Sequence, residues 1–205
     1  MPYATVLKVQ PAPGKGPEVA QKGEEMARQV QASGVRAAFS STLFGDDPAF
    51  YLTAVFDSLA ALEPLLQDLQ ARRAELRPLL SSVGIPSLNE VIAEPPAGGQ
   101  PPAFQTLFTL SPQGGKQQEF MALLMERMQV ERASGMRAVV SVPVSGNIGT
   151  VGVLVLFGSL AEMEKDRALR ATDASWLAFT TQMAGLSAAP PYAEVRRVIV
   201  PLPSQ

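Results

Sequence analysis

Two arginines and two serines occupy matching places in this sequence and could together bind an anion. Arg36 and Ser40 recur 101 residues later as Arg137 and Ser141. A guanidinium group donates paired hydrogen bonds to a carboxylate or phenolate, and a hydroxyl group can add another. We therefore predict that these four residues bind a substrate. The plainer alternative is that each arginine merely follows a helix end and pairs with solvent or a nearby carboxylate.

Tyr51 is the fifth predicted substrate-binding residue, because its phenol lies on an expected strand near the same face. Gly152 stands at the matching place in the second half of the chain. That asymmetry fits a single site in one half, and equally fits loss of a site after duplication. Trp176 has Leu177 and Phe179 nearby and is predicted to be a core residue rather than a ring that stacks on substrate. No catalytic residue is assigned.

The chain contains no cysteine and no histidine. These absences exclude disulfides, a thiol nucleophile, a Ser-His-Asp triad, and zinc or haem held by imidazole. Asp46 and Asp47 are interpreted as residues typical of a hairpin turn rather than as metal ligands. We predict no metal site and no cofactor. Any catalysis would have to use carboxylates, arginine, lysine, tyrosine, serine or the substrate itself.

Composition predicts a globular protein. The chain has 205 residues, 46% of them hydrophobic, and a formal net charge of −2. No cluster of lysine and arginine stands out, so nucleic acid is not an expected partner. No apolar segment is long enough to span a bilayer and no signal-cleavage pattern follows the start, so we expect a cytoplasmic protein without a membrane partner.

The sequence repeats itself. When residues 2–65 are aligned with residues 103–166, 18 of the 64 pairs are identical without a gap. The segment 95–102 has the sequence PPAGGQPP, which excludes helix and strand and marks a linker. We therefore predict a tandem duplication with a first repeat at 1–94, a linker at 95–102 and a second repeat at 103–205.

Each repeat predicts the same order of elements. Short β-rich runs bounded by proline predict strands, and Gly-Lys pairs precede helices that end at Ser-Gly. Two apolar runs separated by a turn then predict a hairpin. Ser58 and Ser159 follow as helix N-caps, and a last β-rich run closes each repeat. The expected strands are 3–9, 35–44, 50–57 and 89–95, then 104–110, 136–144, 150–157 and 193–203.

The order β-α-β-β-α-β is that of the ferredoxin-like unit, whose helices cover one face of a four-stranded sheet. The uncovered face of each unit needs a partner. We predict an α+β fold in which two tandem ferredoxin-like units pack sheet to sheet as an intramolecular α/β barrel, a pseudo-dimer within one chain. Further association into a homodimer is left open.

Strand parity separates the two faces of the second strand of each repeat. Val35, Ala37 and Phe39 point to one side, and Arg36 and Ser40 point to the other. The apolar set is expected to meet the helices. The arginine and serine set is expected to meet the other sheet or to line a cavity there, with the same arrangement in the second repeat.

The paired units resemble the dimeric α/β barrel superfamily. FDSLAALEPLL and FGSLAEMEKD are similar to segments of its NIPSNAP-like and antibiotic-biosynthesis-monooxygenase-like branches. DASWLAFTTQM followed by RRVIVPL resembles the closing segment of NIPSNAP-like domains. The first repeat departs from this pattern, since Glu75 matches Trp176 and Pro64 falls within the second expected helix.

That resemblance implies a range of activities, among them cofactor-independent monooxygenases and haem enzymes. The lack of histidine argues against members that use a histidine ligand or base. We expect a protein that binds a small, hydrophobic, weakly acidic molecule, with cofactor-independent oxygenation as a candidate reaction. The alternative is a non-catalytic module for assembly or protein contact, so whether the chain is an enzyme is left open.

Overall fold

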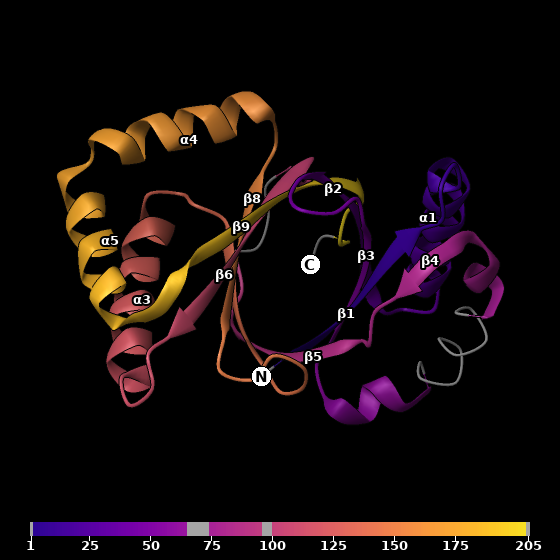
Figure 1. Cartoon of the computed structure of the whole chain (residues 1–205), viewed down its shortest axis with the longest axis horizontal. Helices are drawn as coiled ribbons and strands as arrows, with labels where there is room; N and C mark the ends of the chain where they lie inside the picture. Colours follow the sequence, from indigo (N-terminus) through magenta and orange to yellow (C-terminus); the bar gives the residue numbers. More distant parts are fainter. Residues whose placement is uncertain (1, 65–73, 96–99, 204–205) are drawn as a thin grey trace.

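The computed structural model describes residues 2–64, 74–95 and 100–203. Over these residues the chain forms a closed antiparallel β-barrel with helices on its outside (Figure 1). The helix of the first half lies on one side of the barrel, and those of the second half lie on the other side. The expected α+β barrel within one chain is confirmed.

The first half follows the expected order with one additional strand. Its elements are β1 (Tyr3–Pro11), α1 (Gly16–Ala32), β2 (Arg36–Phe44), β3 (Phe50–Phe56), the 3-10 turns η1 (Leu59–Leu62) and η2 (Arg77–Leu79), β4 (Leu80–Val83) and β5 (Ser87–Ala93). Helix α1 ends at Ala32 with Ser33 as its C-cap, because Gly34 takes a φ of +88°, which glycine adopts without a Cβ clash. Strand β4 was not predicted.

The second predicted helix of the first half begins differently from expectation. The hydroxyl of Ser58 accepts a hydrogen bond from the backbone N–H of Ala61, as an N-cap should, but the turn that it starts is the 3-10 turn η1. Glu63 and Pro64 then continue as α-helix, and proline is tolerated there because the first helical turn does not use its missing backbone N–H. The predicted apolar stripe continues to Leu66 and Leu69, which lie outside the described residues.

The second half has a similar order, with a first helix as long as α1 and two further helices before its last strand. Its elements are β6 (Phe104–Pro112), α3 (Gln117–Ala133), β7 (Ala138–Pro143), β8 (Val151–Phe157), α4 (Leu160–Thr172), α5 (Ala174–Leu186) and β9 (Ser187–Val200). Ser159 caps α4 as predicted, because its hydroxyl accepts from the N–H of Glu162. Strand β9 starts six residues earlier than the predicted 193, at Ser187.

The strands close into a ring in the order β3-β2-β9-β6-β8-β7-β5-β1, and β1 pairs with β3 to complete it. Strand β4 extends the sheet at β1 beyond β5. Two of the pairings join the halves: β5 pairs with β7, and β2 pairs with β9. The last strand of each half thus completes the sheet of the other half.

The way in which the two sheets meet corrects the expected packing of one sheet face on the other. The sheets join through hydrogen bonds at their edges, and their inner faces enclose a cavity. Edge pairing gives hydrogen-bond partners to the backbone N–H and C=O groups that an open sheet edge would leave unpaired. Each half therefore completes the strand pairing of the other half and also covers its inner sheet face.

The apolar core lies between the outside of the barrel and the helices. In the first half, Phe39 and Leu7 pack with Val19 and Met26 of α1. In the second half, Ala138 and Val140 pack with Phe120, Leu124 and Met128 of α3. The predicted parity is confirmed, since these strand residues face helices while Arg36, Ser40, Arg137 and Ser141 line the interior. No helix within the described ranges is long and apolar enough to cross a membrane.

Candidate functional site

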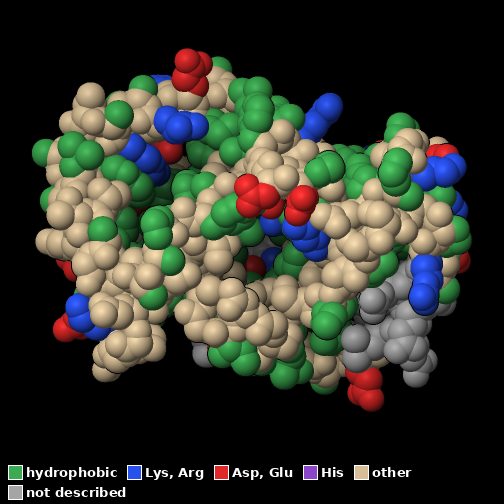
Figure 2. Space-filling view, viewed as in Figure 1, with side chains coloured by type: hydrophobic (Ala, Val, Ile, Leu, Met, Phe, Trp, Pro, Cys, Tyr) green, Lys and Arg blue, Asp and Glu red, His purple; other side chains and the backbone are tan. Residues whose placement is uncertain are grey.

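The interior of the barrel holds a cavity of about 550 Å³. Every strand of the ring contributes residues to its lining. Figure 2 shows the surface hollowed between the two halves, with basic and acidic side chains gathered beside the hollow. Closed barrels of eight strands have room inside for a single small ligand. The volume falls in the range of about 300–1,000 Å³ that is usual for ligand pockets.

All five predicted substrate-binding residues line this cavity: Arg36, Ser40, Tyr51, Arg137 and Ser141. All neighbouring strands are antiparallel, so β2 and β7, four places apart in the ring, run in the same direction. Arg36 begins β2 and Arg137 directly precedes β7. The two arginines therefore lie toward the same rim of the barrel, while their role in binding stays a prediction.

Their contacts distinguish the two arginines. An Nη of Arg36 donates to the carboxylate of Glu94 at 3.2 Å, and its other Nη lies 3.8 Å from Asp57. Arg36 therefore fits the plainer alternative, an arginine neutralised by a nearby carboxylate. Arg137 donates to the backbone oxygen of Gln100 at 2.6 Å. Its Nε is buried and has no hydrogen-bond partner among the residues described.

Tyr51 belongs to a buried group with Glu194 and Arg196. The Tyr51 hydroxyl donates to Oε2 of Glu194 at 2.8 Å, and Nε of Arg196 donates to Oε1 of the same carboxylate. The guanidinium carbon of Arg196 lies 3.4 Å from the centre of the Tyr51 ring. This contact is a cation–π interaction in a place with little solvent.

The environment of this group changes the acidity of the phenol. Burial raises the pKa of Tyr51 to about 12, and the hydrogen bond to Glu194 adds to the increase although the charge of Arg196 opposes it. Tyr51 is therefore protonated at neutral pH. It acts as a hydrogen-bond donor to Glu194 and holds that carboxylate in place against Arg196.

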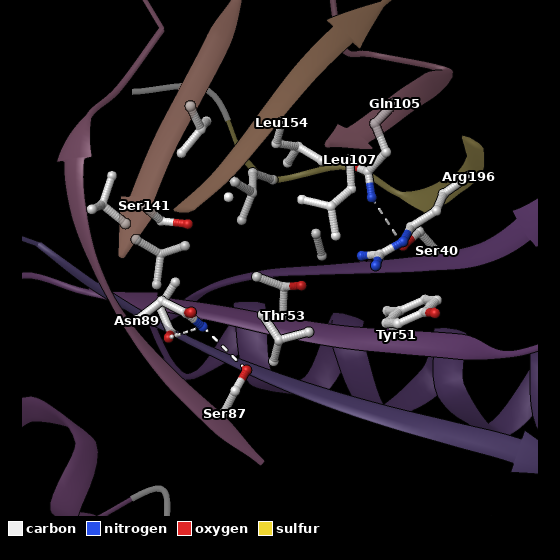
Figure 3. A pocket seen from close by; sticks show the side chains of 18 of the residues that line it. Ser40, Tyr51, Thr53, Ser87, Asn89, Gln105, Leu107, Ser141, Leu154 and Arg196 are labelled. Atoms are coloured by element: carbon white, nitrogen blue, oxygen red, sulfur yellow. Dashed lines mark hydrogen bonds between the residues drawn. The ribbon is translucent and has the colours of Figure 1, made fainter. Parts of the chain in front are cut away.

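Arg196 keeps donors free for a ligand. Only its Nε is used by Glu194, and its two Nη groups make no hydrogen bond within the described part of the chain. Figure 3 shows the guanidinium directed into the cavity beside Ser40 and Gln105. Lys8 also lines the cavity, with its Nζ 6.0 Å from the Tyr51 ring centre.

The charges around the cavity are strongly unequal. Among the described residues, its lining carries four cationic side chains, namely Lys8, Arg36, Arg137 and Arg196, and one carboxylate, Glu94. Glu194 adds a second carboxylate in contact with Arg196. The chain as a whole has a net charge of −2. The interior is thus positive in an acidic protein, and such an interior attracts anions.

Sequence reasoning missed Arg196, Glu194 and Lys8. The signal that could have found the first two is strand parity, since residues 194, 196 and 198 share one face of the last strand. That parity places two charged residues on the inner face, beside Val198. Lys8 alternates in the same way with buried Leu7 and Val9 on β1.

Trp176 corrects another expectation. It is half-buried rather than a core residue, and it does not line the cavity. Its ring lies 3.9 Å from the guanidinium carbon of Arg170 and 5.0 Å from that of Arg127. It therefore covers an ion-pair network among α3, α4 and α5. The described residues also contain no group of three or more acidic side chains that could hold a metal ion.

No protein-family model matches this chain. No curated protein matches it in sequence either. Solved structures do share its fold. A crystal structure named "Putative monooxygenase" from Fusobacterium nucleatum superposes with a TM-score of 0.81 at 11% identity, covering 98% of this chain and 94% of that one.

A second structure of that name, from Lactobacillus acidophilus, has a TM-score of 0.71 at 13% identity and covers 98% of this chain and 95% of that one. An anthrone oxidase-like protein gives a TM-score of 0.61 at 18% identity, covering 97% and 91%. At such low identities these similarities show the fold alone. They agree with the fold that the resemblance to dimeric α/β barrels implies.

Proposed function

We propose that the barrel binds a small, largely apolar molecule that carries an acidic group. The observation that carries this proposal is the excess of cationic side chains around a mostly apolar cavity inside the barrel of a protein of net negative charge. A buried cation with unused donors is costly unless an anion pairs with it. Arg196 has such unused donors: its Nε pairs with Glu194, but both Nη groups line the cavity without a partner among the described residues, so an anionic ligand can take them.

The rest of the lining supports an apolar ligand body. The cavity is also lined by apolar side chains from five strands, namely Val6, Leu107, Val139, Leu154 and Val198. Burying apolar surface contributes about 25 cal/mol per Å², so these walls favour a ring system or a chain over a small inorganic anion. An aromatic acid or a phenol that ionises beside Arg196 satisfies both parts of the lining.

Within this ligand class we propose cofactor-independent oxygenation as the reaction. Converting an activated methylene to a carbonyl needs dioxygen as the oxidant: one oxygen atom enters the product, the other leaves as water, and the substrate supplies all the electrons. The protein then has to bind, orient and stabilise the substrate anion, which Arg196 and Lys8 are placed to do. The fold shared with proteins named as monooxygenases supports this candidate.

The alternative function, a module for assembly, would favour a barrel filled by side chains. A cavity of about 550 Å³ inside the barrel supports ligand binding instead. We also propose that the barrel consists of two ferredoxin-like repeats, at 1–94 and 103–205. In support, the first half has the strand order β2-β3-β1-β5 and the second half has the equivalent order β7-β8-β6-β9.

Calorimetric titration with 2-naphthoate tests the proposed binding. We expect the Arg196→Met variant to bind it at least about tenfold more weakly, because a charge-assisted hydrogen bond is lost. Arg197→Met is the matched control, since Arg197 is the next residue on β9, is exposed and does not line the cavity. Equal affinities of the Arg196→Met variant and the wild type would contradict the proposed binding.

The proposed reaction has its own test. Anthrone, an acidic polycyclic methylene compound, is incubated with the protein while dioxygen uptake and formation of the quinone are recorded. We expect the wild type to exceed the spontaneous oxidation and the Arg196→Met variant to fall toward it. Binding of 2-naphthoate without any acceleration of anthrone oxidation would leave a binding protein and remove the oxygenase candidate for this substrate.

A further inference from the structure

Strands β9 and β5 lie on opposite sides of the barrel. They are four places apart in a ring of eight strands, whichever way the ring is followed. The two strands also correspond in the repeat: Asn89 pairs with Ala4 of β1, and Arg196 pairs with Gln105, which is 101 residues after Ala4. Asn89 is therefore the counterpart of Arg196, directly across the cavity.

The positions around Asn89 that match the cationic group are polar or small, and none of them is charged. By the same register, Ser87 is the counterpart of Glu194, and Gly152 is the counterpart of Tyr51. The cationic group on one wall thus faces a neutral amide and hydroxyl group on the other. Two identical repeats would give the cavity two equivalent walls. Here the two walls differ in charge, so the two ends of a bound ligand would meet different chemical groups.

Acceptors on the neutral wall are unused. Nδ2 of Asn89 donates to Ser87 Oγ at 3.2 Å and to the backbone oxygen of Ala4 at 3.5 Å, which fixes the orientation of the amide. Among the described residues, neither Oδ1 of Asn89 nor Oγ of Ser141 takes part in a hydrogen bond. Both side chains line the cavity, and Ser141 has room beside it because Gly152 has no side chain.

Figure 3 shows the two polar groups separated by a stretch that is apolar except for Thr53. Arg196, Tyr51, Ser40 and Gln105 lie at one side of the view, and Asn89, Ser87 and Ser141 lie at the other, with Leu107, Leu154 and Thr53 between them. A ligand that reaches both groups has an apolar body with a polar group at each end.

We infer that the cavity binds one two-ended molecule in a single orientation: its acid group pairs with Arg196, and a hydroxyl group at its far end donates to Asn89. The ligand class is a hydroxylated aromatic acid or a diphenol with one ionised hydroxyl. The reverse orientation is disfavoured because it would place the acid beside Asn89, Ser87 and Ser141, none of which is charged, and away from Arg196. This inference rests on the proposed binding function and adds the far contact, the orientation and the stoichiometry.

A pair of probes isolates the far contact. Calorimetric titrations compare 2-naphthoate with 6-hydroxy-2-naphthoate, which differ only in the hydroxyl at the far end. In the wild type we expect one molecule of either probe per chain, with the hydroxylated probe roughly threefold to tenfold tighter, the usual effect of one hydrogen bond. In Asn89→Leu that difference should vanish while the affinity for 2-naphthoate stays within about twofold.

The controls separate this inference from the proposed function. Arg196→Met should weaken both probes equally, and Glu90→Gln, the next position on β5 and outside the cavity lining, should weaken neither. If Asn89→Leu impairs folding in a thermal melt, Asn89→Ala provides the same comparison.

Two outcomes overturn the inference while the proposed binding stands. The first is that 6-hydroxy-2-naphthoate binds the wild type no more tightly than 2-naphthoate does, and the second is that two probe molecules bind per chain. Loss of affinity for both probes in Asn89→Leu would also overturn it, because Asn89 would then act on the whole cavity. Failure of both probes to bind the wild type would contradict the proposed function and this inference together.

Discussion

The guanidinium carbon of Arg196 lies 3.4 Å from the centre of the Tyr51 ring, and one carboxylate, Glu194, binds both side chains. The side chains of Arg196 and Glu194 are only 7% and 6% exposed. A carboxylate and a cation this deeply buried stabilise each other mainly by avoiding an unpaired charge. Removing one of them therefore has a different consequence from removing both.

The first prediction is a double-mutant cycle on this pair. Glu194→Gln and Arg196→Met are each expected to lower the free energy of unfolding by about 3–5 kcal/mol, since each leaves a buried charge unpaired or poorly paired. The combined variant should lose clearly less than the sum, because it buries no charge. Urea denaturation measures all four proteins. Additive losses would show that the two side chains do not interact.

The second prediction concerns alkaline pH. The pKa of Tyr51 is raised from 10.0 to about 12, so between these values the unfolded chain has lost the phenol proton while the folded chain keeps it. Stability is therefore present in full below pH 10.0 and decreases as the pH rises toward about 12. The full loss is roughly 2–3 kcal/mol.

Urea denaturation of the wild type and of Tyr51→Phe, from about pH 9 to about pH 11.5, measures this decrease. The variant has no phenol at this position, so its free energy of unfolding should fall less steeply. Parallel curves for the two proteins would mean that Tyr51 titrates normally in the fold. The absorbance of tyrosinate near 295 nm provides a second readout of the same ionisation.

The third prediction tests the correspondence of the repeats. A Cβ atom at Gly23 of α1 would lie 2.1 Å from Cζ of the Phe39 ring, so Gly23→Leu should destabilise the first half by about 1–3 kcal/mol or more through overpacking. The matching pair in the second half is Leu124 and Val140, both buried in its core. Adding Phe39→Val to Gly23→Leu should therefore restore much of the lost stability. Urea denaturation compares the two, and a double variant no more stable than Gly23→Leu would contradict this correspondence.

The fourth prediction concerns the helices of the second half. The carboxylate of Glu131 pairs with Arg127 and, at 3.1 Å, with Arg170, and Arg127 and Glu131 are each only 10% exposed. Their counterparts in the first half are the apolar Met26 and Val30. Glu131→Val alone should lower the free energy of unfolding by about 1.5–3 kcal/mol, because it removes the carboxylate that both arginines share while Arg127 keeps Asp173 and Arg170 keeps Asp166.

Combining Glu131→Val with Arg127→Met installs the apolar pair of the first half and should recover part of that loss. Trp176, the single tryptophan of the chain, lies against both arginines and reports on the network. Its fluorescence during urea denaturation measures the effect directly. A double variant less stable than Glu131→Val alone would contradict the expected compensation.

Local rules in the sequence predicted most of the elements correctly. Alternation with a period of two placed Phe39 toward the helices and Arg36 and Ser40 toward the interior, because successive side chains of a strand point to opposite faces. Glycines after Ser33 and Ser134 marked helix ends correctly, with φ values of +88° and +94° at Gly34 and Gly135. The repeat itself extended each assignment from one half to the other.

The contacts that each site residue makes could not be predicted from such local patterns. Arg36 and Arg196 are both arginines on inner strand faces, yet Arg36 meets Glu94, 58 residues away, while Arg196 meets Tyr51 across the β2–β9 junction. Sequence supplied no local signal for either pairing. Similarly, Trp176 has apolar neighbours along the chain, but its position is decided by arginines on two other helices.

The sequence by itself determined the 18 identities at a spacing of 101 residues, the strand and helix periods, the turns that end them and the absence of histidine and cysteine. These properties depend on residues close together in the chain or on composition. The tertiary structure decided that β5 joins β7 and β9 joins β2, and hence that the two sheets enclose a cavity with Arg196 and Asn89 on opposite walls. Those pairings form between distant segments, where hydrogen bonding at sheet edges and burial of the whole barrel select one arrangement that no short stretch of sequence encodes.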